Sequence, residues 1–245
     1  MSEVLLLVSK GVFAAAGCFA GVRLSQNARR HGGDALQRRA SVMILVGGAG
    51  LLGFGLGPLL APYSTALARS LMLLADGLER VALLLLAWSV WHVFGRGGAL
   101  RNGLLASIVA ILGLDWLQML SEQQWPATRL PVFVDATSQL AFATPFLWST
   151  VEAWREHQRS RRRVVLGLTD ASVANRFFLW AFATGCLALV CLTTALLKLV
   201  AGMPTLAATL ECALALIYCA VAGAILLGFQ RRPAAGGVSA PAADA

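Results

Sequence analysis

The stretch ALARSLMLLADGLERVALLLLAWSVWHVF, residues 66–94, decides the fold class. It is long and apolar enough to cross a membrane, because about 20 apolar residues span the hydrocarbon core of a bilayer. It also carries Asp76, Glu79 and Arg80 near its middle. A charged side chain at the centre of a membrane helix costs about 2.5–3.5 kcal/mol. These three residues therefore need partners, water or a functional role inside a helical bundle.

The composition of the whole chain agrees with a membrane protein. Of its 245 residues, 58% are hydrophobic and 13% are charged, whereas about 25% of a soluble domain is charged. Similar apolar stretches recur along the chain, so we predict an all-α membrane protein, a single bundle of seven transmembrane helices within residues 1–232. The expected spans are about 4–22, 41–61, 66–94, 103–122, 131–152, 176–199 and 205–229. The Pro-, Gly- and Ala-rich tail, 233–245, is expected to be disordered and cytoplasmic.

The distribution of basic residues predicts the orientation. Most of them lie in the segments 23–40, 95–102 and 153–176 and just after the last span, while the alternate segments 62–65, 123–130 and 200–204 contain only Arg129. Basic residues favour the cytoplasmic side of a membrane. We therefore expect the amino terminus outside, the carboxyl terminus in the cytoplasm and the chain in the inner membrane of a bacterium.

Polar residues inside the spans form the candidate ligand-binding site. They fall in the middle and outer half of the expected bundle, and they are Lys10, Asp76, Glu79, Arg80, Asp115, Gln118, Asp135, Gln139, Glu211 and Tyr218. Asp76 precedes Arg80 by four residues, the favourable order for an ion pair within a helix. Lipid cannot solvate such side chains, so they should face the bundle interior.

Carboxylates outnumber bases in these spans, even when Lys198 at an outer helix end is counted. The excess must be protonated, hydrated or neutralised by a cation or an amine-bearing ligand. Three interpretations follow: a structural network in which Asp76–Arg80 and one interhelical pair hold the bundle together, a pocket open to the outside, or a pathway for protons or ions.

The second span, about 41–61, contains the glycine-rich stretch GGAGLLGFGLGP at 47–58. Gly53 and Gly57 have the spacing that lets another helix approach closely. Close packing is the prediction for this span, with a hinge as the alternative.

Catalytic and metal-binding patterns are missing from the sequence. His31, His92 and His157 are far apart and lack ligand spacing. The five cysteines all fall inside apolar runs, and none has the CxxC spacing of a metal or redox site. The histidines are expected on the side opposite the acidic residues, which disfavours a nucleophilic triad. We expect no enzyme activity, no cofactor and no metal.

The layout of seven helices with an external amino terminus resembles that of microbial rhodopsins and seven-helix receptors. The resemblance to rhodopsins implies a Schiff-base lysine in the last helix, and TLAATLECALALIYCAVAGAILLGF, 205–229, has none. The stretch RRRVVLGLTDASVANRFFLW, 161–180, resembles a segment of bacterial seven-helix inner-membrane proteins of uncharacterised function. This likeness implies a fold and no activity.

Arginines in the two long expected cytoplasmic loops form a second candidate site, for anionic lipid headgroups or a signalling partner. They are Arg29, Arg30, Arg38, Arg39, Arg159, Arg161, Arg162 and Arg163. Their position at a membrane surface argues against nucleic acid as the partner. The leading hypothesis is a receptor-like sensor with an outward-facing acidic pocket that signals through these loops. The alternatives are a small ion- or proton-coupled transporter and a non-catalytic scaffold.

Overall fold

A computed structural model describes residues 2–30, 35–60, 62–94, 98–121, 132–168, 171–199 and 204–229. In these ranges the regular elements are seven α-helices: α1 (Ser2–Arg30), α2 (Ala35–Leu60), α3 (Thr65–Phe94), α4 (Ala99–Ser121), α5 (Val132–Val165), α6 (Ala171–Leu199) and α7 (Pro204–Phe229). The all-helical fold class predicted from the sequence is confirmed for this part of the chain. Residues 233–245, predicted to be disordered, lie outside it.

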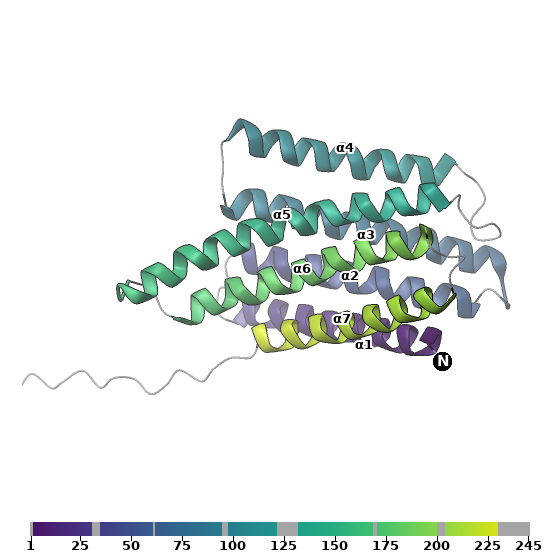
Figure 1. The fold of residues 1–245 in the computed structure, drawn as a ribbon, viewed down its shortest axis with the longest axis horizontal. Helices are drawn as coiled ribbons and strands as arrows, with labels where there is room; N and C mark the ends of the chain where they lie inside the picture. Colours follow the sequence, from purple (N-terminus) through teal and green to yellow (C-terminus); the bar gives the residue numbers. More distant parts are fainter. Residues whose placement is uncertain are drawn as a thin grey trace, which may run out of the picture.

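The helices run up and down along one long axis (Figure 1). By their contacts, six of the described helices form a ring. Around this ring, α1 packs on α2, α2 on α3, α3 on α5, α5 on α6, α6 on α7, and α7 returns to α1. The remaining helix, α4, lies outside the ring against α3 and α5. It is the outermost helix at the top of the view in Figure 1.

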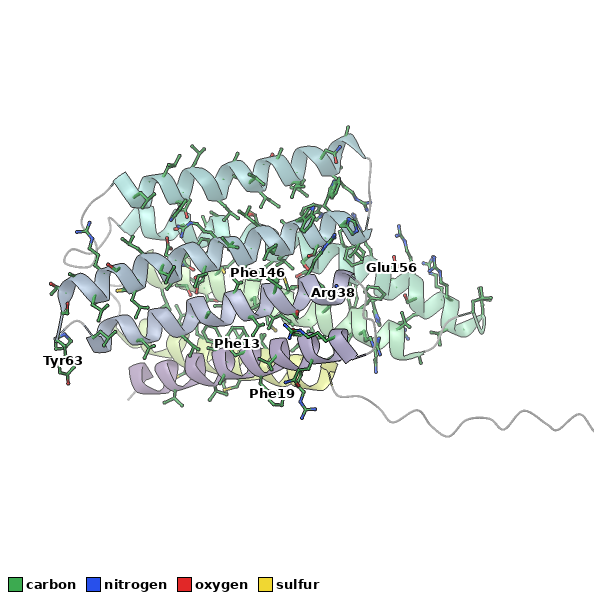
Figure 2. All side chains as sticks on the ribbon, turned by 180° about the vertical axis from the view of Figure 1, so that it is seen from behind. Phe13, Phe19, Arg38, Tyr63, Phe146 and Glu156 are labelled. Carbon is green, nitrogen blue, oxygen red and sulfur yellow. The ribbon has the colours of Figure 1, made fainter. Side chains whose placement is uncertain are left out.

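Two apolar clusters fill the bundle. The first joins α3, α4, α5 and α6 and includes Leu86, Ile108, Leu112 and Trp148. The second joins α1, α6 and α7 and includes Phe13, with Leu214 and Tyr218 opposite it. Figure 2 shows Phe13 and Phe146 directed into the bundle, and Phe19 directed away from it.

Glycines of α2 allow close contacts with both neighbouring helices. A Cβ atom on Gly50 would lie 3.0 Å from the carbonyl oxygen of Ala75, and one on Gly53 would lie 2.7 Å from the Cβ of Ala75, both on α3. On the other side of α2, a Cβ on Gly48 would lie 2.8 Å from the Sγ of Cys18 on α1. These distances support the close packing expected for α2. The side chain at position 57 is outside the described part of the structure, so the Gly53–Gly57 spacing stays a prediction.

The helix α5 continues well past the expected end of its span. We expected a loop from 153 to 176, but the helix continues to Val165 and the next one begins at Ala171. Gly167, at φ 71°, ends α5 in a Schellman motif, in which the amide of Leu168 donates to the carbonyl of Arg163 at 2.9 Å. Hydropathy predicts where the apolar segment of a helix ends, but it does not predict where the helix itself ends.

The expected loop 23–40 differs from the structure in the same way. Here α1 continues to Arg30 and α2 begins at Ala35. Most of the arginines assigned to the two long loops therefore lie on helices that extend past the apolar segments. These helix ends all belong to one end of the bundle, the end that carries Glu156, whereas Tyr63 lies at the opposite end (Figure 2).

Candidate functional site

Asp76 and Arg80 of α3 form a buried charged cluster with Asp115 of α4, hereafter the triad. The exposed fractions of the three residues are 4%, 4% and 9%. Arg80 pairs with Asp76 one turn earlier in α3, as the spacing predicted. Its Nη2 donates to Oδ2 of Asp115 at 2.5 Å. One guanidinium thus joins an acid of its own helix to an acid of the peripheral helix.

Backbone and aromatic groups complete the surroundings of this guanidinium. Its Nη1 also donates to the carbonyl oxygen of Asp76 at 3.2 Å. Its Cζ lies 5.0 Å from the centre of the Phe142 ring on α5. An aromatic face attracts a cation, and this attraction is stronger away from water. The triad is therefore located where α3, α4 and α5 meet.

The charge of the triad is not balanced. Two ionised carboxylates and one guanidinium sum to −1. Within the described part of the chain, Asp76 Oδ2 and Arg80 Nε are buried without a hydrogen-bond partner. A buried charge is tolerated only when it is paired, hydrogen-bonded or removed by protonation. Binding of one proton or one small cation would neutralise the cluster.

Glu79, next to Arg80 in sequence, lies on another side of α3. Its Cγ would be 2.8 Å from a Cβ atom on Gly50, so it lies against α2. Its charge is close enough to interact with Cys191 of α6 and Tyr218 of α7. The ring of Tyr218 in turn lies 5.4 Å from that of Phe13 on α1. Glu79 and Tyr218 therefore form a second polar position, inside the ring of helices and separate from the triad.

The remaining predicted pocket residues are not brought to the triad by any described contact. Gln118 is exposed on α4, and Gln139 is half-buried on α5. The side chains of Lys10, Asp135 and Glu211 lie outside the described part of the structure. A cavity of about 420 Å³ lies between α3 and α4, and it is lined by Val81, Leu84, Leu85, Trp88, Leu105 and Val109. None of the seven predicted pocket residues whose side chains are described lines it.

A second set of polar contacts holds the other end of α4. Arg101 Nη2 lies 3.2 Å from both carboxylate oxygens of Glu152 on α5, and its Nη1 donates to the Phe94 carbonyl of α3 at 2.6 Å. Trp91 Nε1 donates to Asn102 Oδ1 at 2.8 Å. Sequence reasoning did not identify these contacts, because the partners are far apart along the chain. The sequence feature that could have indicated them is Glu152, an acid at the edge of an expected span beside a basic segment.

Side-chain hydrogen bonds connect α5 and α6, and these were also missed. Trp180 Nε1 donates to Ser149 Oγ at 2.7 Å, and Thr150 Oγ1 donates to Thr184 Oγ1 at 3.0 Å. His157 Nδ1 lies 2.8 Å from the carbonyl oxygen of Ala174. Ser, Thr and Trp side chains are common in membrane helices for many reasons, so their presence alone does not identify a partner.

The arginines predicted to contact lipid or a partner gather at one end of the bundle. Those on α5 lie on the part of the helix that extends past the bundle, where Arg159 and Arg163 are 3.3 Å and 3.9 Å from Glu156. Arg39 of α2 differs, because it is half-buried with its Cζ 4.3 Å from the centre of the Trp88 ring. The side chain of Arg30 is outside the described residues, and exposed members of the set are Arg29, Arg38, Arg159, Arg161, Arg162 and Arg163.

Two described segments are long and apolar enough to cross a membrane, Ala99–Gln118 of α4 and Val173–Leu197 of α6. Buried core helices of soluble proteins can meet the same criterion, but only 17% and 28% of these segments are buried. On α4 the exposed large hydrophobic side chains are Leu100, Leu104, Val109, Ile111, Leu114, Trp116, Leu117 and Leu120. Exposed apolar side chains grouped in this way are typical of membrane or protein interaction surfaces.

Within the described residues, no group of three or more His, Cys, Asp or Glu side chains is placed to hold a metal ion. Comparison of the chain with protein families, curated proteins and solved structures found no match. The function must therefore be argued from the geometry of the triad and of the helix that it holds.

Proposed function

We propose that this chain is a multi-pass membrane protein with a receptor-like, sensory role, and that the position of α4 is the quantity it regulates. The observation that carries the proposal is the shared guanidinium of Arg80, which holds α4 to α3 through Asp115. The apolar outer surface of α4 supports the membrane location. The seven spans rest on the recurring apolar stretches of the sequence, and the orientation with the amino terminus outside rests on the distribution of basic residues.

The triad suits a two-state switch because its charge depends on occupancy. With both carboxylates ionised, the two acids compete for one guanidinium. A proton or a cationic group at Asp76 removes this competition and changes the strength of the α3–α4 connection. The nearest further ionisable group in sequence is Glu79, while α5 contributes the apolar face of Phe142.

A change at α4 has a route to the arginine-rich end. Arg101 of α4 is bound to Glu152 of α5, one turn before the part of α5 that carries Arg155 and Arg159. These arginines would meet anionic lipid headgroups or an acidic signalling partner at the membrane surface. In this scheme the ligand is a proton, a small cation or an amine.

The test is amide hydrogen exchange of the full-length protein in nanodiscs, measured across pH 5–8 and with a panel of cations and amines. For the wild type we expect protection of residues 99–121 to change with pH or with one of the ligands. Asp115→Asn should abolish this response. Glu156→Gln, which removes a carboxylate from the exposed ion pairs of α5, should leave it intact.

Equal and constant protection of α4 in all three proteins would overturn the sensory proposal. It would favour the scaffold alternative, in which the triad only specifies helix packing. A response that Glu156→Gln also abolishes would place the sensing group at the basic end.

The transporter alternative is supported by Glu79 and Tyr218, since both are polar groups inside the ring of helices. It predicts substrate- or proton-driven flux in liposomes that is lost in Glu79→Gln and kept in Asp115→Asn. Absence of flux under any imposed gradient counts against it.

A further inference from the structure

The cavity between α3 and α4 has a defined shape and position. Its volume, about 420 Å³, falls in the range of pockets for small ligands, about 300–1,000 Å³. Val81, Leu84, Leu85 and Trp88 line it along one face of α3, from position 81 to position 88 or about 10 Å of helix. Leu105 and Val109 line it from α4. All the described lining residues are aliphatic or aromatic, so the matching ligand group is a hydrocarbon chain.

A cation lies at the end of this groove. Trp88 is six residues, or about 9 Å, from the end of α3 at the arginine-rich end of the bundle. The guanidinium of Arg39 stacks on the ring of Trp88, with its Cζ 4.3 Å from the ring centre. The same side chain therefore lines the groove and carries the cation.

The hydrogen-bonding capacity of Arg39 is not used up by the protein. Its Nη1 is buried and has no hydrogen-bond partner among the residues that the structure describes. A guanidinium presents five N–H donors in a planar fork that matches the oxygens of a phosphate group. The face of Trp88 attracts the charge but accepts no conventional hydrogen bond.

We infer that the groove between α3 and α4 binds one acyl chain of an anionic phospholipid, whose phosphate group is held by Arg39. The inference rests on the membrane location given under the proposed function. In a bilayer any acyl chain could fill the groove, because lipid tails are as apolar as its lining. Selection must therefore come from the headgroup, and Arg39 supplies the complementary charge. A lipid bound here would also contact α4, the helix held by the triad.

Native mass spectrometry of the detergent-purified full chain tests this site. Phosphatidylglycerol and phosphatidylcholine with identical acyl chains are the probes. The wild type should bind phosphatidylglycerol about fivefold more tightly, the effect of one arginine near a headgroup. Arg39→Gln should lose this preference, and Arg39→Lys should retain it.

Two matched control variants exclude nonspecific effects. One removes another arginine at the same end of the bundle, and the other adds a bulky side chain elsewhere on α4. Arg23 also stacks on an aromatic ring, Phe19 of the same helix, at the same end of the bundle. Arg23→Gln should keep the preference. Val109→Trp fills the groove and should abolish it, whereas Leu114→Trp, on an exposed face of α4, should leave it unchanged. If Arg39→Gln fails to fold, the Val109→Trp and Leu114→Trp pair still decides the result.

Equal binding of the two lipids by the wild type would overturn the inference. So would a preference that survives both Arg39→Gln and Val109→Trp. Failure of the membrane location itself is a different result, because the chain would then be released from cell membranes by alkaline carbonate extraction.

Discussion

Single residues decide how α4 is attached. Arg80 is paired with two buried carboxylates, so its removal leaves both of them without this counter-charge. Asp76 and Asp115 are both less than a tenth exposed. The Asp76–Arg80 pair was predictable from its spacing of four residues along a helix. The partner Asp115 was a candidate, but only the fold places it beside Arg80, because interhelical neighbours are not encoded in local periodicity.

Arg80→Met is expected to lower the free energy of unfolding by roughly 3–5 kcal/mol, the usual cost of breaking a buried ion pair by removing one partner. The measurement is chemical or thermal unfolding in nanodiscs. Arg159→Met is the matched control, because that arginine pairs with Glu156 at an exposed position. Its loss should cost about 0–1 kcal/mol. Equal effects of the two substitutions would contradict the role given to Arg80.

The bond between Trp180 and Ser149 makes a second prediction at this scale. A double-mutant cycle of Trp180→Phe and Ser149→Ala should give a coupling energy of about 0.6 kcal/mol, with about 1.7 kcal/mol as an upper limit for membrane helices. Ser149 is completely buried, so Trp180→Phe alone leaves its hydroxyl without this donor. A coupling energy of zero would mean that the 2.7 Å contact contributes nothing.

Helices α2 and α3 show how much of an element can be predicted and where the prediction stops. The glycine-rich stretch 47–58 pointed to close packing, and α3 approaches this face of α2 closely. Gly53 was singled out with Gly57, but Gly50 has the tightest contact with backbone atoms, those of Ala75 and Glu79. A spacing of four residues names a candidate face, and only the neighbouring helix determines which glycines on it are essential.

Gly50→Ala and Gly113→Ala should therefore change stability in opposite directions. The added methyl group at Gly50 would meet backbone atoms at 3.0–3.2 Å, and overpacking of this kind costs about 1–3 kcal/mol. At Gly113 of α4 no described atom would lie within 4 Å of an added Cβ, so the gain in helix propensity, up to about 1 kcal/mol, should dominate. Thermal unfolding of the two variants beside the wild type is the measurement. Equal shifts would show that α2 and α3 can separate without cost.

At the scale of the whole molecule, hydropathy predicted the number and order of the helices. It did not predict that α4 lies outside the ring, because α4 is as apolar as its neighbours and its sequence does not record how many helices surround it. It also misjudged the ends of α1 and α5, where Arg29, Arg159 and Arg163 continue the helix as good helix formers in water. The sequence predicted which polar residues could form the candidate site. Only the structure shows that Glu79 lies apart from the triad.

The prediction for the whole molecule concerns its orientation, with the end that carries Tyr63 outside the cell. Tyr63 and Leu166 lie at exposed turns, 88% and 70% exposed, at opposite ends of the bundle. A cysteine at position 63 should react with a membrane-impermeant maleimide in intact cells, and one at position 166 only after the membrane is permeabilised. Labelling of the wild type gives the background reaction of its five native cysteines. The reverse pattern would invert the topology inferred from the basic residues.

The contacts of α2 have a mechanical consequence. Since glycine backbone lies directly against α1 on one side and α3 on the other, these three helices have little freedom to slide or tilt separately. Side-chain hydrogen bonds join α5 to α6 in a comparable way. We expect two stiff plates, α1–α2–α3 and α5–α6, and a hinge line where α3 meets α5. The helix α4 crosses that line on the outside, with Asp115 fixed to one plate and Arg101 fixed to both. We therefore expect the polar contacts of α4 to be the first to lengthen when the two plates rotate relative to one another.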